Sequence, residues 1–151
     1  MDEIEYVPID DGLKESSNPK NFPVATIREI RDRDGQRCRC CGRTNVLFET
    51  IPHHIFRKSE IDASLANKAE NGAVICKQCH RWIHQGSNKF EIQYGKIFDA
   101  KLKMESIAMF KDSKIDQQDF KKLYEICRKR GVFDAAVELK TGDFDGVLFL
   151  T

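Results

Sequence analysis

Residues 76–84 read CKQCHRWIH and bring two thiols and two imidazoles together within one short stretch. The C-x2-C pair of Cys76 and Cys79 has one counterpart, Cys38 and Cys41, with 34 residues between the two pairs. Zn²⁺ favours four thiolates in a tetrahedron, and a C-x2-C turn places two sulfurs on the same side of the backbone. The two pairs therefore predict one closed, structural zinc site that clamps these segments together.

The remaining two cysteines are left out of this site. Cys40 does not form a C-x2-C pair, and Cys127 falls on the apolar face of an expected helix, where core packing is its expected role. The acidic start of the chain lacks the pattern of a secretory signal, so we expect a reducing compartment. There, close cysteine pairs are more often metal ligands than disulfides.

The four histidines of the chain form two clusters. His80 and His84 are four residues apart on an expected helix, so they share a face and can hold one metal ion; two exposed polar residues are the alternative. His53 and His54 follow a β-rich segment, and adjacent residues on an extended chain point in opposite directions. We therefore expect one of them to bind metal and the other to transfer protons, a role that suits the near-neutral pKa of histidine.

Charge is unevenly distributed along the 151 residues. Net charge is +1 overall, but residues 1–22 sum to −4 and residues 23–90 to +5, and most cations of the central segment are arginines. Arginine matches phosphate geometry, so this segment is either a phosphate-binding surface or an ordinary solvated face. No apolar run approaches the roughly 20 residues that span a bilayer. We expect a soluble, cytoplasmic protein without a membrane partner.

Local patterns predict an α+β chain with an acidic, flexible arm over 1–22, a core over 23–90 and an α/β extension over 91–151. The expected helices cover residues 24–35, 77–86 and 116–131. The expected strands cover residues 45–51 and 73–76, with a hairpin over 135–150. Alternation over 89–95 and 97–104 favours two more strands, with a helix as the alternative. Residues 57–72 are polar and predict a long loop with room for one helical turn.

Residues 28–85 resemble the zinc-knuckle branch of the HNH endonucleases. The resemblance is carried by the order of CRCCG, HHI, Asn71 and CKQCHRWIH in this sequence. It implies a ββα-metal (His-Me finger) core with a four-cysteine structural zinc site. The expected C-terminal helix and hairpin would be additions to that core.

The resemblance also implies a role for each matching residue. His53 corresponds to a metal ligand on the first strand, and His54 to the general base that activates water. Asn71 corresponds to the residue that holds the loop so that His54 is correctly aimed. His80 corresponds to a second metal ligand, and His84 to a third that is found in members such as the colicin DNases.

Two arginines lie near the matching residues, and the chain departs from the family pattern at some positions. Arg57 and Arg81 lie close in sequence to site histidines, so each is either a phosphate contact or a solvent-exposed residue. Many members have an acidic residue two positions before the histidine pair, where this chain has Ile51, and Glu49 lies two positions earlier. Gly72 follows Asn71 where the family usually has a large aliphatic residue.

The implied activity is metal-dependent hydrolysis of DNA, by nicking or double-strand cleavage. The cofactors would be the structural Zn²⁺ and one catalytic divalent metal: Mg²⁺, Mn²⁺, Ni²⁺, Co²⁺ or Zn²⁺. Double-stranded DNA is the expected partner, and a homodimer or a phage or bacterial protein partner is compatible with the sequence. The alternatives are a non-catalytic zinc module that binds nucleic acid and a zinc-stabilised protein-interaction domain. Both leave the His–His–Asn set unexplained.

Overall fold

The computed structural model describes residues 21–133. Almost all of the expected acidic arm over residues 1–22, and the whole of the expected hairpin over 135–150, lie outside the described residues. The expected zinc pairs, the four histidines and Asn71 all lie inside them.

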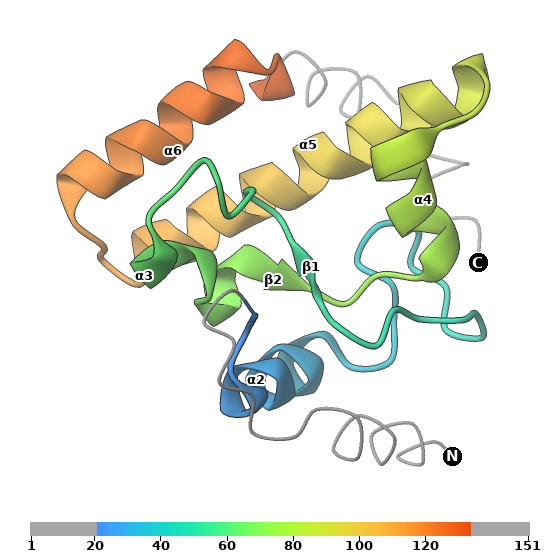
Figure 1. The fold of residues 1–151 in the computed structure, drawn as a ribbon, viewed down its shortest axis with the longest axis horizontal. Coiled ribbons are helices and arrows are strands. Elements are labelled where there is room, and N and C mark those ends of the chain that lie inside the picture. Colours follow the sequence, from blue (N-terminus) through green and yellow to red (C-terminus); the bar gives the residue numbers. More distant parts are fainter. Residues whose placement is uncertain (1–20, 134–151) are drawn as a thin grey trace.

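The described chain is α+β, mostly helical, with one small antiparallel sheet (Figure 1). Its helices are α2 (Val24–Asp34), α3 (Ala63–Ala66), the 3-10 helix η2 (Ala69–Asn71), α4 (Lys77–Gln85), α5 (Lys89–Asp112) and α6 (Gln117–Lys129). The predictions of α2, α4, α6 and of one helical turn in the loop are confirmed. Within residues 21–133, none of these helices combines the length and apolar character needed to cross a membrane.

The sheet is shorter than the sequence predicted. Strands β1 (His53–His54) and β2 (Gly72–Ala73) pair antiparallel, with His53 opposite Ala73 and His54 opposite Gly72. A single bridge between Phe48 and Cys76 continues the pairing outward. The expected strands at 45–51 and 73–76 therefore meet at only a few positions, but their contact brings the histidine doublet beside the segment that leads into α4.

The strands expected at 89–95 and 97–104 are wrong, because both stretches belong to the single helix α5. Its first turn is capped by Asn88, whose side chain accepts a hydrogen bond from the backbone N–H of Glu91. Its buried residues recur every three or four positions, as at Tyr94, Ile97 and Phe98. The helix packs on α4 and on α6, so apolar residues face two neighbours and mask the helical period. The boundary expected between residues 90 and 91 falls inside this helix.

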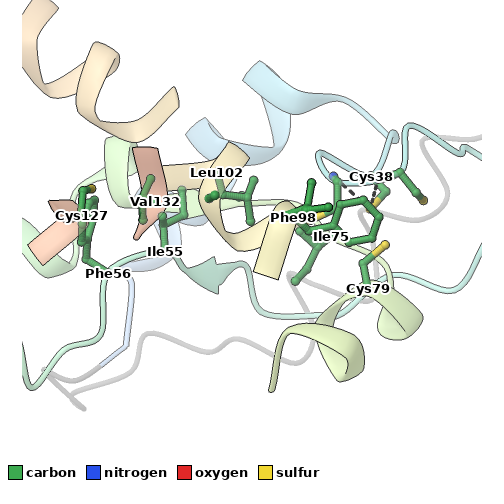
Figure 2. Close-up of a cluster of buried hydrophobic side chains, with 14 of the residues drawn as sticks. Cys38, Ile55, Phe56, Ile75, Cys79, Phe98, Leu102, Cys127 and Val132 are labelled. Atoms are coloured by element: carbon green, nitrogen blue, oxygen red, sulfur yellow. Dashed lines mark hydrogen bonds between the residues drawn. The ribbon is translucent and has the colours of Figure 1, made fainter. Parts of the chain in front are cut away.

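One hydrophobic core joins the cysteine segments to α5 and α6. Figure 2 shows it as a row of side chains with Cys38 and Cys79 at one end, Phe98 and Leu102 in the middle and Cys127 at the other end. At the contact between α4 and α5, a Cβ on Gly95 would lie 2.1 Å from the carbonyl oxygen of Trp82. Only glycine therefore permits this close approach, which fixes the position of α4.

A smaller core lies between α2 and β2. It contains Phe22, Ile27, Ile30 and Val74. A Cβ on Gly72 would lie 2.3 Å from Cδ1 of Ile30 and 3.0 Å from Cζ of Phe22. The glycine that follows Asn71 is thus explained by the aromatic and aliphatic side chains that occupy the space of a larger residue.

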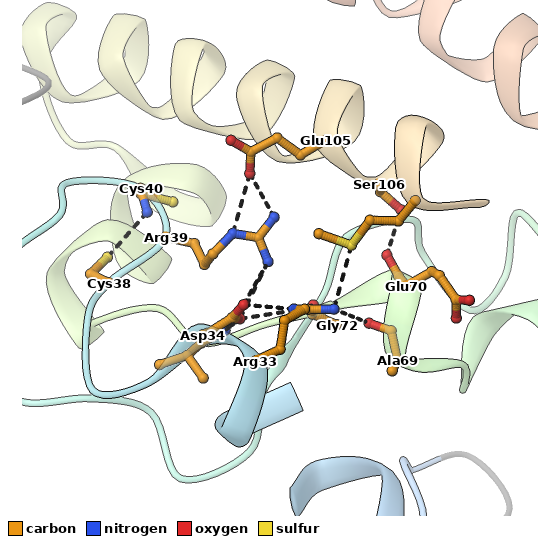
Figure 3. Close-up of polar contacts among 12 residues, drawn as sticks. Arg33, Asp34, Cys38, Arg39, Cys40, Ala69, Glu70, Gly72, Glu105 and Ser106 are labelled. Atoms are coloured by element: carbon orange, nitrogen blue, oxygen red, sulfur yellow. Dashed lines mark hydrogen bonds and ion pairs between the residues drawn. The ribbon is translucent and has the colours of Figure 1, made fainter. Parts of the chain in front are cut away.

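Charged side chains of α2 and the cysteine loop fix β2 and α5 in place (Figure 3). The guanidinium of Arg33 donates to the carbonyl oxygen of Gly72 at 2.6 Å. Asp34 accepts from the backbone N–H of Val74 at 3.0 Å and pairs with Arg39 at 3.1 Å. Arg39 also pairs with Glu105 on α5 at 2.6 Å. This network locks the strand that pairs with the histidine doublet to the loop that carries Cys38 and Cys41.

Candidate metal centres

Four cysteines from the two predicted pairs form one buried cluster. The sulfurs of Cys38, Cys41, Cys76 and Cys79 all lie within 4.8 Å of one another, and all four residues are buried. A closed set of four thiols at this spacing fits a tetrahedral structural zinc ion. The sequence prediction of four cysteines that could bind zinc is therefore matched by their geometry.

The backbone around the cluster suits thiolates. Amide N–H groups of Cys40, Cys41 and Cys76 donate to the sulfur of Cys38 at 3.3 to 3.5 Å, and the N–H of Cys79 donates to the sulfur of Cys76 at 3.4 Å. Hydrogen bonds from neighbouring thiols, that of Cys40 first, lower the pKa of Cys38. Zinc requires thiolates, and this environment stabilises the negative charge on Cys38, whereas the hydrogen bond with Cys38 raises the pKa of Cys76 and of Cys79.

The two cysteines left out of the prediction are also buried. Cys40 lies within the same core, and burial raises the pKa of its thiol well above the usual value. Cys127 packs in the core from α6, and burial raises its pKa to about 11. Both are thus neutral thiols in apolar surroundings, unlike Cys38.

Three of the four histidines form a second cluster beside the first. Ligand nitrogens of His53, His80 and His84 lie within 4.8 Å of one another. The ring centroids are 5.3 Å apart for His53 and His80, 5.5 Å for His53 and His84, and 4.6 Å for His80 and His84. The face shared by His80 and His84 on α4 therefore meets one side of the strand that carries His53.

The lowered pKa values of His53 and His84 suit binding of a metal ion. Nε2 of His53 is buried and has no hydrogen-bond partner among the described residues. Burial lowers the pKa of His53 well below its usual value, and the charges of His80 and His84 lower it further. Burial also lowers the pKa of His84, followed by the effect of His80. Metals bind the neutral form of imidazole. A neutral histidine whose buried nitrogen has no hydrogen-bond partner is therefore well suited to bind a metal ion.

Glu49, for which no role was predicted from the sequence, orients His80. Oε2 of Glu49 lies 2.8 Å from Nδ1 of His80. A carboxylate in this position holds Nδ1 protonated, which leaves Nε2 as the ligand atom. The only signal in the sequence was an acidic residue near the histidine pair, displaced by two positions from where the resemblance placed one.

His54 points away from the three-histidine cluster, as strand alternation requires. Its ring stacks on Phe22, with centroids 3.9 Å apart and an interplanar angle of 8°. Its Nε2 lies 3.0 Å from Oδ1 of Asn67. Burial lowers the pKa of His54, and the hydrogen bond with Asn67 opposes that shift. Because an amide oxygen can only accept, Nε2 carries the proton and Nδ1 is the basic nitrogen.

Asn71 holds the loop that follows His54. Its Oδ1 accepts from the backbone N–H of Phe56 at 2.8 Å, and its Nδ2 donates to the carbonyl oxygens of Phe56 at 3.1 Å and Ala66 at 2.9 Å. The side chain is fully buried. It therefore closes the loop that carries Asn67, the partner of His54, which was not predicted from the sequence.

A buried lysine supports the same loop from α5. Nζ of Lys103 donates to the carbonyl oxygen of Ile55 at 2.8 Å and pairs with Asp99 at 2.6 Å. It also lies 5.3 Å from the ring centroid of Phe56. The residues directly after the histidine doublet are therefore held by a helix that lies outside the segment of resemblance.

Two cavities open on either side of the histidines. One, here called the histidine cleft, has a volume of about 950 Å³ and is lined by His80, Glu49, Asn67, Lys58 and neighbouring residues. The other, here called the side groove, has a volume of about 1150 Å³ and lies along α4, α5 and the residues after α6. The residues that line both cavities are His53, His54, His84 and Arg57.

The two candidate phosphate contacts differ in position. Arg57 is exposed and lines both cavities, beside the histidines. Arg81 is exposed and lies 3.9 Å from Glu91 at the start of α5, and it lines neither cavity. The structure therefore brings Arg57, but not Arg81, to the histidine site.

Searches of protein-family models, curated proteins and solved structures found no match to this chain. The chemistry of the site therefore follows from its own residues. They comprise a closed four-thiol cluster, an open three-imidazole cluster and a separately held fourth histidine between two cavities.

Proposed function

We propose that this protein is a metal-dependent DNA endonuclease of the HNH type, with β1, β2 and α4 as its ββα-metal core. The observation that carries the proposal is the division within the doublet. His53 joins the three-imidazole cluster, while His54 is held on the other side by Phe22 and Asn67. A protein that only bound zinc or nucleic acid would have no need of a separately oriented base beside a metal site.

The metal would be held by His53, His80 and His84. Three ligands leave coordination positions for water and for a phosphate oxygen, unlike the closed four-thiol cluster. A divalent ion there would supply Lewis-acid stabilisation of the negative charge that builds on the phosphate. Imidazole ligands suit Mn²⁺, Co²⁺, Ni²⁺ and Zn²⁺, whereas Mg²⁺ prefers oxygen.

His54 would act as the general base. Its Nδ1 takes a proton from a water molecule, and the water oxygen forms a bond to phosphorus. The bond from phosphorus to the 3′ oxygen breaks, and the leaving oxygen takes a proton from solvent. Asn67 accepts from Nε2–H throughout, which keeps the ring in the tautomer that the reaction needs and stabilises the imidazolium that forms.

Cationic residues at the site would position the phosphate. Arg57 lies where the two cavities meet, beside the histidines, and Lys58 lines the histidine cleft. A guanidinium can hold two phosphate oxygens at once. The choice of DNA follows the resemblance to the HNH endonucleases, so RNA is included in the test below.

The test compares wild-type protein with His54→Ala on supercoiled plasmid and on RNA of similar length. Each is incubated with Mg²⁺, Mn²⁺, Co²⁺, Ni²⁺, Zn²⁺ or no added metal. We expect the wild type to nick or linearise plasmid with at least one metal, and His54→Ala to be about 10²- to 10⁴-fold slower. Lys122→Ala, on the exposed face of α6, is the matched control and should cut like the wild type.

Three results would count against this proposal. If the wild type cuts with none of these metals, the protein is not a nuclease of this kind. If His54→Ala cuts as fast as the wild type, the assigned base is wrong. If RNA alone is cut, the substrate is wrong and the mechanism stands.

A further inference from the structure

The side groove has a cationic wall of which the proposed reaction uses only Arg57. The cationic residues that line it are Arg57, Lys89, Lys96, Lys103 and Arg130. Two of them are neutralised: Lys103 pairs with Asp99, and Arg130 pairs with Glu60. The other three are exposed, and no ion pair joins them to any residue within 21–133. The groove therefore carries a net positive charge that favours a polyanion.

The same groove also has an apolar wall. Trp82 and Ile83 from α4, Ile92 and Ile97 from α5, and Val132 line it. Ile92 is 47% exposed, so an apolar side chain of this groove faces solvent. A site that bound phosphates alone would not need apolar side chains. A site for unpaired bases would need them, because the flat faces of the bases bind to apolar and aromatic side chains while the phosphate backbone lies along the cationic residues.

The groove is also continuous with the site of the proposed reaction. It shares His53, His54, His84 and Arg57 with the histidine cleft. Its volume of about 1150 Å³ exceeds the roughly 300–1000 Å³ of small-molecule pockets. A strand with its scissile phosphate at His54 would therefore enter the groove with its next nucleotides.

We propose that the side groove binds an unpaired segment of the substrate strand directly beside the cleaved bond. Lys89, Lys96 and Arg57 contact its phosphates, and Ile92 and Trp82 contact its bases. This inference rests on the proposed nuclease function and narrows its substrate to DNA with a single-stranded portion, such as a fork or flap. Fully paired DNA has no base faces to offer this wall.

The experiment measures binding without cleavage, with the His54→Ala protein, its cysteine-bound zinc intact and no added metal. Fluorescence anisotropy compares a blunt duplex, a single strand and a forked duplex with one unpaired tail. The groove variants add Lys89→Ala and Lys96→Ala together, or Ile92→Ser alone. The matched controls add Lys121→Ala and Lys122→Ala on α6, or Leu47→Ser, which is 76% exposed and lies outside the groove.

We expect the fork to bind more tightly than the blunt duplex. The double lysine variant should weaken fork binding and reduce the slope of log affinity against log salt by about 1 to 2. Ile92→Ser should weaken binding of the fork by about fivefold while leaving blunt duplex unchanged. The control variants should bind all three DNAs like their parent.

The experiments distinguish failure of the proposed groove binding from failure of the proposed nuclease activity. If the fork and the blunt duplex bind with equal affinity, and neither groove variant loses affinity, the proposal for the side groove is overturned even if the wild type cuts plasmid. Preferential fork binding that the groove variants abolish supports the groove even if the wild type cuts with no metal. Cleavage of forks by the double lysine variant at the wild-type rate at limiting substrate would also overturn it.

Discussion

The cysteine cluster and the histidine cluster share the segment 76–84 but differ in closure. All four thiols are buried, and backbone N–H groups donate to their sulfurs. The three imidazoles pass from buried His53 through half-buried His80 to exposed His84. Cys79 and His80 are neighbours on α4, so one helical turn serves both. A complete buried shell fixes the fold, whereas an incomplete shell beside a cavity leaves room for a substrate.

The largest expected effect is loss of the closed cluster. Cys76→Ser removes one of the four clustered thiols and the sulfur that caps α4, so we expect the variant to lose both zinc binding and the clamp. Because zinc binding contributes directly to folding, we expect a loss of about 5 kcal/mol or more in the free energy of unfolding. Zinc content and thermal unfolding by circular dichroism measure both quantities.

Cys127→Ser is the matched control for that variant. Cys127 is buried but far from the cluster along the core, so its variant should cost only about 1 to 3 kcal/mol and keep its zinc. A Cys76→Ser protein that retains a full equivalent of zinc and its thermal stability would show that the cluster is not a structural zinc site.

The next largest effect separates the two sides of the doublet. His54→Ala should reduce cleavage about 10²- to 10⁴-fold while binding added Mn²⁺ or Co²⁺ normally. His84→Ala, which removes an exposed ligand at little cost in stability, should instead weaken binding of the added metal. Isothermal titration calorimetry and plasmid cleavage distinguish them. If both variants lose metal equally, the proposed division between ligand and base is wrong.

A smaller effect is expected from the carboxylate behind the open cluster. Glu49→Gln removes the charge that orients His80 but keeps a similar shape, so metal affinity should fall about 10- to 100-fold. The absorption of bound Co²⁺ provides the measurement. Glu125→Gln, which removes an exposed carboxylate paired with Arg128 on α6, should leave the affinity unchanged. Equal affinities for the two variants would exclude a role for Glu49.

The smallest expected effect concerns Asn67, the hydrogen-bond partner of the proposed base His54. Asn67→Ala removes one hydrogen bond to the ring of His54, so kcat should fall about 5- to 10-fold with little change in KM. Asn67→Asp retains an acceptor oxygen and should keep most of the activity. A rise in KM without a fall in kcat would instead assign Asn67 to substrate binding.

Local patterns in the sequence predicted much of this architecture. Helices α2, α4 and α6 follow from apolar spacing and end signals, and the paired C-x2-C spacing predicted which four cysteines would meet. The opposite orientations of His53 and His54 follow from the two-residue period of an extended chain. These features depend on residues near one another in sequence, where backbone geometry limits the choices.

Other features depended on contacts between distant segments. The pattern over 89–104 favoured strands over the helix α5 that forms there, because the neighbours that bury the different faces of the helix are not visible in its own pattern. The contacts of Glu49 with His80 and of Asn67 with His54 cross 31 and 13 residues. The local sequence offers only the acidic character of Glu49 near the histidine pair, and nothing that distinguishes Asn67 from other polar residues.

By itself, the sequence determined the ligand types, their pairing along the chain and the helix that presents His80 and His84. Only the tertiary structure decided which polar groups orient those ligands, and that the histidines lie between two cavities. The physical reason is the separation along the sequence of the residues that each feature depends on. Backbone periodicity fixes the direction of a side chain within its own element, but burial, hydrogen-bond partners and cavities arise where elements pack. Here they arise where α5 lies against α4 and the loop that follows the doublet.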